Sequence, residues 1–207
     1  MASGDLIETR AERNRRLGAI IKPLRTAAYE VDFPWAHMDS LFAGWARDYG
    51  GIEFDPDFQR GHVWTPSQQC HFIENILRGV VSSSGFLMQF NCANWDTIGV
   101  QRDSDLPDGF QCIDGLQRIT AVREFLAGRV RPFGLSVDDL DCSSFSPKSN
   151  AFRFRVAVHD FQFRADLLQH YIDLNSGGTP HSNEEIARVR RLLESAQEPA
   201  IVEVPAP

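Results

Sequence analysis

The segment with the clearest chemical potential is Asp-Gly-Leu-Gln-Arg at residues 114–118. An apolar stretch at 110–113 precedes it and a helical pattern at 117–126 follows it, so the spacing predicts a strand, a tight turn and a helix in direct succession. Such a junction points backbone N–H groups and the positive end of the helix toward one place, which suits a phosphate group. Gly115 has no Cβ, which allows a ligand to come close to the backbone.

Two charged side chains of this segment indicate chemistry on that phosphate. Arg118 falls in the first turn of the expected helix, where a cation is unfavourable beside the helix dipole unless an anion lies next to it. Asp114 is a candidate general base or magnesium ligand, because phosphoryl transfer depends mainly on positioned charge. A structural interpretation also fits the spacing, with Asp114 capping the helix and Gly115 forming the turn.

Two further segments carry candidate ligands. Gln59 and Arg60 lie between an expected strand and an expected helix, and Arg60 is a candidate second phosphate ligand. Asp55 and Asp57 are candidate metal ligands, although aspartate beside proline in a turn is usually structural. Asn175 begins an Asn-Ser-Gly-Gly-Thr stretch, whose consecutive amides either form an anion-binding nest or simply end one helix and begin the next.

The hydrophobic pattern along the chain predicts the elements that position these residues. We expect helices at 33–49, 117–126, 165–174 and 182–193, and one more that Thr65 caps, Pro66 begins and Gly79 ends. The expected strands are 52–54, 85–90, 110–113, 130–135 and 152–158. Residues 1–30 are expected to form a tail or helix, residues 31–194 a nucleotide-binding domain, and residues 195–207 a disordered tail.

The composition limits the class of protein. With 207 residues, 43% of them hydrophobic, the chain can bury one sizeable core. No run of about 18 apolar residues is present and the N-terminus is polar, so we expect no membrane span and a cytoplasmic location. The net charge of −7 argues against binding nucleic acid over the whole surface. The four cysteines lack the close spacing of zinc sites, so we expect reduced thiols, mostly buried.

Four motifs, in this order and at this spacing, resemble the DUF262 family, as found in the N-terminal domain of GmrSD-type modification-dependent restriction enzymes. They are Pro-Asp-Phe-Gln-Arg-Gly-His-Val-Trp at 56–64, Ile-Leu-Arg-Gly at 76–79, Asp-Gly-Leu-Gln-Arg at 114–118 and Leu-Asn-Ser-Gly-Gly-Thr at 174–179. The resemblance covers about residues 31–194. It implies an α+β, ParB/sulfiredoxin-like fold with a small mixed sheet flanked by helices. One departure is Leu116, at a position that is often glutamine in the family.

The resemblance also implies roles for individual residues. The expected catalytic residues are Asp114, Arg118 and Arg60, with Asp114 as the metal ligand. The expected nucleotide-binding residues are Gln59, Arg60, Gly115, Gln117, Arg118 and Asn175. The implied cofactors are a nucleoside triphosphate (ATP, GTP or CTP) and Mg²⁺. The expected partners are the nucleotide and DNA, and a homodimer is among the expected assemblies.

These observations support one main hypothesis and two alternatives. The main hypothesis is an NTP-dependent phosphoryl-transfer enzyme, an NTPase or kinase, that acts on or near DNA in phage DNA modification or antiphage restriction. One version is a kinase of hydroxymethylated bases in DNA. The alternatives are a nucleotide-gated DNA-binding module without chemistry and a metal-dependent DNA-nicking nuclease. Many family members add an HNH nuclease, but this sequence contains no such cluster and no P-loop motif. We therefore expect neither an isolated HNH nuclease nor an NTPase of the P-loop class.

Overall fold

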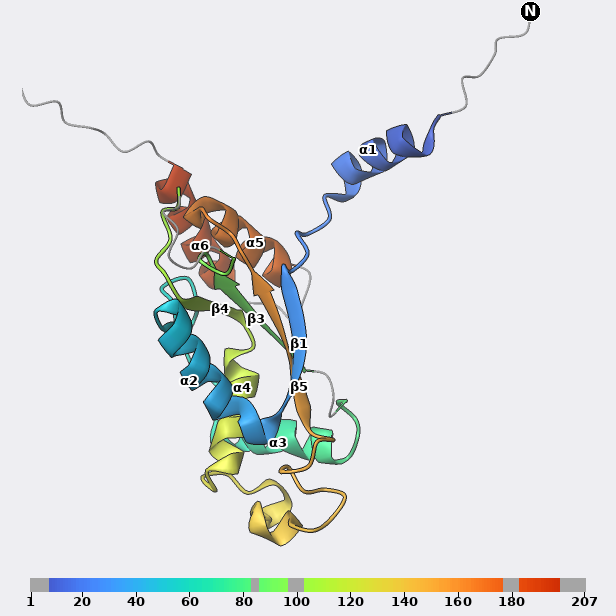
Figure 1. Cartoon of the computed structure of the whole chain (residues 1–207), viewed down its shortest axis with the longest axis vertical. Coiled ribbons are helices and arrows are strands. Elements are labelled where there is room, and N and C mark those ends of the chain that lie inside the picture. The colour runs from blue at the N-terminus through green and yellow to red at the C-terminus, as the bar shows by residue number, and fades with distance from the viewer. Residues whose placement is uncertain (1–7, 83–85, 97–102, 177–182, 198–207) are drawn as a thin grey trace, which may run out of the picture.

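The architecture is a mixed five-stranded sheet with helices around it (Figure 1). A computed structural model describes residues 8–82, 86–96, 103–176 and 183–197. The strands are β1 (Tyr29–Pro34), β2 (Ile52–Glu53), β3 (Phe86–Cys92), β4 (Phe110–Asp114) and β5 (Arg153–His159), in the order β1-β5-β3-β4-β2. β5 pairs with β3 and β4 with β2 in parallel, whereas the other two pairs are antiparallel. The α+β class with a small mixed sheet is therefore confirmed.

Two hydrophobic clusters lie on the two faces of this sheet. The helices are α1 (Arg10–Ile21), α2 (Met38–Tyr49), α3 (Pro66–Leu77), α4 (Leu116–Leu126), α5 (Arg164–Ser176) and α6 (Asn183–Gln197). Buried side chains of α2, α3 and α4 join one cluster, and those of α5 and α6 join the other. Because successive strand residues face opposite sides, Cys112 of β4 enters the first cluster and Ile113 the second. The end of β4 thus lies between both helical layers.

Local capping signals explain where α2 ends and where α3 begins. The Thr65 hydroxyl oxygen accepts a hydrogen bond from the backbone nitrogen of Gln68, and the Gln68 side-chain oxygen accepts one from the backbone nitrogen of Thr65. Pro66 occupies the first helical position. Gly50 ends α2 in the left-handed region at φ 104°. The start of α3 at Thr65 and Pro66 was predicted from the sequence and is confirmed. The two signals fix the two ends of the connection that carries residues 54–64.

Three predicted elements differ from the structure. The helix expected from residue 33 begins at Met38, because residues 29–34 form β1 along the edge of β5. The strand expected at 130–135 is wrong: Pro132–Gly134 is a 3-10 turn in which Phe133 has φ 54°, and proline cannot donate to a sheet ladder. The disorder expected from residue 195 is also wrong as far as Gln197, where α6 ends, and residues 198–207 lie outside the described part.

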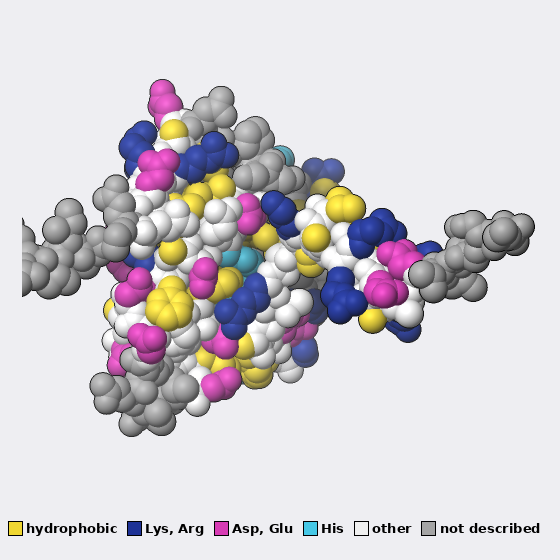
Figure 2. All heavy atoms as spheres, turned by 90° about the horizontal axis from the view of Figure 1, so that it is seen from above, with side chains coloured by type: hydrophobic (Ala, Val, Ile, Leu, Met, Phe, Trp, Pro, Cys, Tyr) yellow, Lys and Arg dark blue, Asp and Glu magenta, His cyan; other side chains and the backbone are white. Residues whose placement is uncertain are grey.

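Helix α1 stands apart from the body of the protein (Figure 1). It contains no buried residue, and Figure 2 shows basic and acidic side chains along it. No helix of the described segments has the length and apolar character needed to cross a membrane. All four cysteines are free thiols, two of them buried, with Cys142 exposed.

Candidate functional site

A cavity of about 470 Å³ opens where the connection before α3, the β4–α4 junction and the end of α5 meet. It is lined by Gln59, Arg60, Trp64, Ile113, Asp114, Gly115, Leu116, Gln117, Arg118, Tyr171, Leu174 and Asn175. All seven residues predicted for the site lie in this wall, although they come from three separate parts of the chain. Leu116 turns mainly into the core, where it is 9% exposed.

The turn between β4 and α4 depends on Gly115. Gly115 has φ 105°, a conformation that other residues rarely adopt. A Cβ at this position would lie 2.9 Å from Cγ and 3.1 Å from Cα of Met88 on β3. The missing side chain therefore allows β3 and the turn to pack together, while the approach of a ligand to Gly115 stays a prediction.

Asp114, the last residue of β4, forms an ion pair with Arg118 in the first turn of α4. Asp114 does not cap α4, since Gly115 occupies the cap position without any side-chain hydrogen bond. The side chains are 38% and 28% exposed, so both remain accessible from the cavity. The anion that accompanies Arg118 is thus a carboxylate of the protein, and a bound phosphate is not required to explain a cation at the start of this helix.

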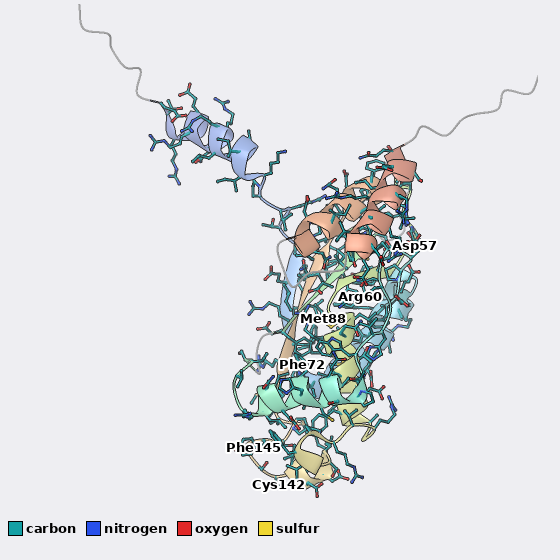
Figure 3. All side chains as sticks on the ribbon, turned by 180° about the vertical axis from the view of Figure 1, so that it is seen from behind. Asp57, Arg60, Phe72, Met88, Cys142 and Phe145 are labelled. Carbon is teal, nitrogen blue, oxygen red and sulfur yellow. The ribbon has the colours of Figure 1, made fainter. Side chains whose placement is uncertain are left out.

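Arg60, on the connection before α3, lines the same cavity (Figure 3). Its Nη1 lies 3.8 Å from Oε2 of Glu185 on α6, and its side chain is 32% exposed. At this distance and exposure the pair contributes little stability. The cavity wall itself contains two arginines and one carboxylate, so its charge favours an anionic ligand.

Gln59 and Gln117 join the two motifs to each other. The Gln59 amide donates to the backbone oxygens of Cys112 and Ile113, at 2.9 and 2.6 Å. The Gln117 amide oxygen accepts from the backbone nitrogens of Val63 and Trp64, at 3.0 and 3.1 Å. The nitrogen of Gln117 donates to the Gly61 oxygen at 2.6 Å. Both glutamines thus hydrogen-bond to the backbone and hold the two motifs together. Their binding of nucleotide stays a prediction.

Two arginines that the sequence analysis did not select also hold this connection. Arg188 of α6 donates to the consecutive backbone oxygens of residues 57–59. Arg164 of α5 pairs with the carboxylate of Asp57, with contacts of 2.8 and 2.7 Å. Asp57, considered above as a metal ligand, is therefore committed to an ion pair. No motif marks either arginine, because their partners are more than a hundred residues away in sequence.

Helix α5 supplies the remaining wall. Burial, and to a lesser extent the Glu185 carboxylate, raises the pKa of Tyr171 to about 12, so its hydroxyl stays protonated at neutral pH. The Asn175 side chain donates to the Tyr171 backbone oxygen at 2.8 Å. Asn175 is thus in the last turn of the helix rather than in a loop. Residues 177–182 of the predicted anion nest lie outside the described residues.

Comparison with protein families identifies the source of this arrangement. Residues 46–195 match the family "GmrSD restriction endonuclease, N-terminal domain". The chain belongs to this family. The matched range contains every residue of the cavity wall, whereas α1 and β1 precede it. No curated protein and no solved structure matches the chain.

Membership in the GmrSD N-terminal domain family indicates a role related to restriction or DNA modification, with enzymatic activity in the broad sense and interaction with DNA. The residues of the cavity also limit how it can hold a metal. Among the described residues, no group of three or more His, Cys, Asp and Glu side chains is arranged to hold an ion. Mg²⁺ usually needs only one or two carboxylates when phosphates and water complete its shell. Asp114 therefore fits Mg²⁺ that arrives with a nucleotide.

Proposed function

We propose that this domain binds a nucleoside triphosphate with its phosphates in the cavity, and that it hydrolyses the nucleotide or transfers its terminal phosphoryl group to an acceptor on or near DNA. One observation carries the proposal. Arg60 and Arg118 come from different elements and line the same cavity, at the amino end of α4. Two guanidinium groups and a helix start are the features that bind and stabilise phosphate oxygens.

We propose a role for each of these side chains. Arg60 and Arg118 neutralise the charge that spreads over the phosphoryl oxygens during transfer. Asp114 accepts the proton of the attacking water or hydroxyl group as its oxygen bonds to the terminal phosphorus, and the nucleoside diphosphate leaves with the electrons of the broken P–O bond. Leu174, an apolar residue of the wall, keeps bulk water away from the reacting atoms. Where Asp114 does not serve as the base, it would hold Mg²⁺, and the ion would supply positive charge near the phosphate oxygens.

One observation favours a second candidate function. In the structure, Asp114 is paired with Arg118 and is not free to act as a base. A site that keeps this pair after nucleotide binding acts as a switch, in which the bound nucleotide changes DNA binding without chemistry. The metal-dependent nuclease lacks comparable support in the described segments, which hold no cluster of acidic metal ligands.

A label-transfer assay separates these functions. The protein is incubated with Mg²⁺ and each γ-labelled nucleoside triphosphate, alone, with plain DNA and with hydroxymethylated DNA. Free labelled phosphate identifies a hydrolase, and label on DNA identifies a kinase. Bound, intact nucleotide that changes DNA affinity identifies a switch, and cut DNA identifies a nuclease. Absence of nucleotide binding under all conditions would refute the proposed function.

Variants of Asp114 test the proposed base. Asp114→Asn keeps the shape of the side chain, so we expect a folded protein whose turnover falls by roughly 100-fold or more. Without Mg²⁺, we expect the variant to bind inorganic triphosphate at least as tightly as the original protein, because one negative charge is gone. Asp48→Asn is the matched control, since Asp48 also pairs with a neighbouring arginine but lies on α2 outside the cavity. Near-normal turnover of Asp114→Asn would remove this residue from the mechanism.

A further inference from the structure

A second cavity, of about 450 Å³, adjoins the first along α3. It is lined by Trp64, Ser67, Gln68, His71, Phe72 and Asn75. Trp64 is the residue that the two cavities share, so its side chain forms the boundary between them. Figure 3 shows Phe72 on α3 and Arg60 on the connection that leads to it.

The two cavities differ in charge. The first contains Arg60, Arg118 and Asp114, whereas the second contains no aspartate, glutamate, lysine or arginine. Its wall combines aromatic rings with hydroxyl and amide groups. Such a surface suits an uncharged, flat, heteroaromatic ring with hydrogen-bonding edges, and it does not suit a phosphate.

Trp64 is held in a position where such a ring can stack on it. Its backbone nitrogen donates to the side chain of Gln117 at 3.1 Å, and Gln117 also lines the first cavity. Its side chain packs on Phe72 with ring centroids 5.4 Å apart, and it remains half-exposed. An indole supported in this way is a preorganised stacking surface.

We propose that the second cavity is the base subsite of the nucleotide, with the base stacked on Trp64 and the triphosphate reaching Arg60 and Arg118. This inference rests on the proposed function, because it requires the phosphates to occupy the first cavity. Ser67 offers a hydroxyl to the edge of the base. The Asn75 side-chain nitrogen is 3.1 Å from Nε2 of His71, so Asn75 offers its amide oxygen as an acceptor. Such a subsite would allow the protein to distinguish a nucleotide from inorganic phosphates of similar charge.

The test compares ATP with inorganic triphosphate, which carries the phosphates without a base. Dissociation constants are measured by calorimetry for the original protein and for Trp64→Leu and Trp64→Phe. Loss of one stacking surface typically weakens base binding by about 5- to 100-fold. We expect this loss for ATP with Trp64→Leu, a change of less than about 3-fold with Trp64→Phe, and triphosphate affinity within about 2-fold in both.

A second variant and a control keep the result interpretable. Ser67→Phe adds a bulky ring in the second cavity from an exposed position on α3, so it should weaken ATP while leaving triphosphate binding unchanged. Phe145→Leu is the control, because Phe145 is an exposed aromatic residue that lines a different cavity. It should change the affinity for neither ATP nor triphosphate. Equal loss of ATP and triphosphate, or unchanged ATP affinity in Trp64→Leu and Ser67→Phe, overturns the base subsite. If the original protein binds inorganic triphosphate as tightly as ATP, only this inference fails. If it binds neither ligand, the proposed function fails as well.

Discussion

Replacing Gln117 by leucine should destabilise the protein, because its amide group connects α4 to the backbone of the connection before α3. The substitution removes three hydrogen bonds, to the nitrogens of Val63 and Trp64 and to the oxygen of Gly61. Each intramolecular hydrogen bond contributes a net of about 0.5–1.5 kcal/mol. Val63 is half exposed, so water replaces part of the loss, and we expect a decrease of about 2 kcal/mol in the free energy of unfolding.

Urea unfolding at pH 7 measures this decrease, and hydrogen exchange localises it to the amides of Val63 and Trp64. Gln117→Glu retains the oxygens that accept from these amides but places an acceptor against the Gly61 oxygen. It should therefore lose roughly 1 kcal/mol and keep part of the amide protection. Gln169→Leu is the matched control, because the Gln169 amide bonds to the Asp173 side chain on the surface of α5.

One result would refute the reasoning. If Gln117→Leu unfolds at the same urea concentration as the original protein and the two amides stay protected, the three hydrogen bonds do not hold the connection. If nucleotide binding is nevertheless lost, Gln117 contacts the ligand directly, as the family resemblance implied.

Three further predictions concern neighbouring features. Gly115→Ala should lower the free energy of unfolding by about 1–3 kcal/mol, measured in urea, because φ is 105° and the new Cβ would meet Met88 at 2.9 Å. Burial lowers the pKa of His159 to about 4. Between about pH 6.5 and 4 the histidine is therefore protonated in the unfolded chain but not in the folded protein, so the free energy of unfolding decreases as the pH falls through this range. His159→Phe should reduce the slope of stability against pH in that window by up to about 1.4 kcal/mol per pH unit. Arg188→Leu should weaken ATP binding by about 10-fold, measured by calorimetry, because three loop carbonyls lose their common donor.

Each of these predictions has a contrasting outcome. Gly44→Ala, inside α2 with nothing within 4 Å of the new Cβ, should stabilise the protein by about 0.5–1 kcal/mol, in contrast to Gly115→Ala. Equal effects of the two substitutions contradict the packing argument. An unchanged pH slope in His159→Phe assigns the proton to another group. Unchanged ATP affinity in Arg188→Leu shows that the connection keeps its shape without that arginine.

Local signals in the sequence were sufficient for the elements around the site. The capping residues Thr65 and Gln68 and the apolar run before Asp114 depend on neighbours in sequence, and all were interpreted correctly. Strand β1 was missed, although Tyr29, Val31 and Phe33 alternate with polar residues or proline. Its helical interpretation failed because pairing with β5 is a contact between distant parts of the chain, which overrides local periodicity.

The site shows the same division between local and distant information. The motifs identified the residues around the cavity, since a strand, a turn and a helix in succession are a local pattern. They did not identify what each side chain contacts. Gln117 bonds to residues more than fifty positions away, and Arg188 to residues about 130 positions away. Side-chain partners at such separations follow from the folded arrangement and not from spacing along the chain.

The pairing of Asp114 with Arg118 connects nucleotide binding to the proposed chemistry. In the structure the guanidinium of Arg118 is paired with the carboxylate of Asp114, the last residue of β4. In the proposed reaction, an incoming phosphate competes for Arg118, because the charge-assisted hydrogen bonds of a guanidinium suit phosphate as well as carboxylate. The same exchange that secures the phosphate releases Asp114 to accept a proton. A base that becomes available only when the anion is bound needs no separate activating residue, which is consistent with the small number of charged groups in this cavity.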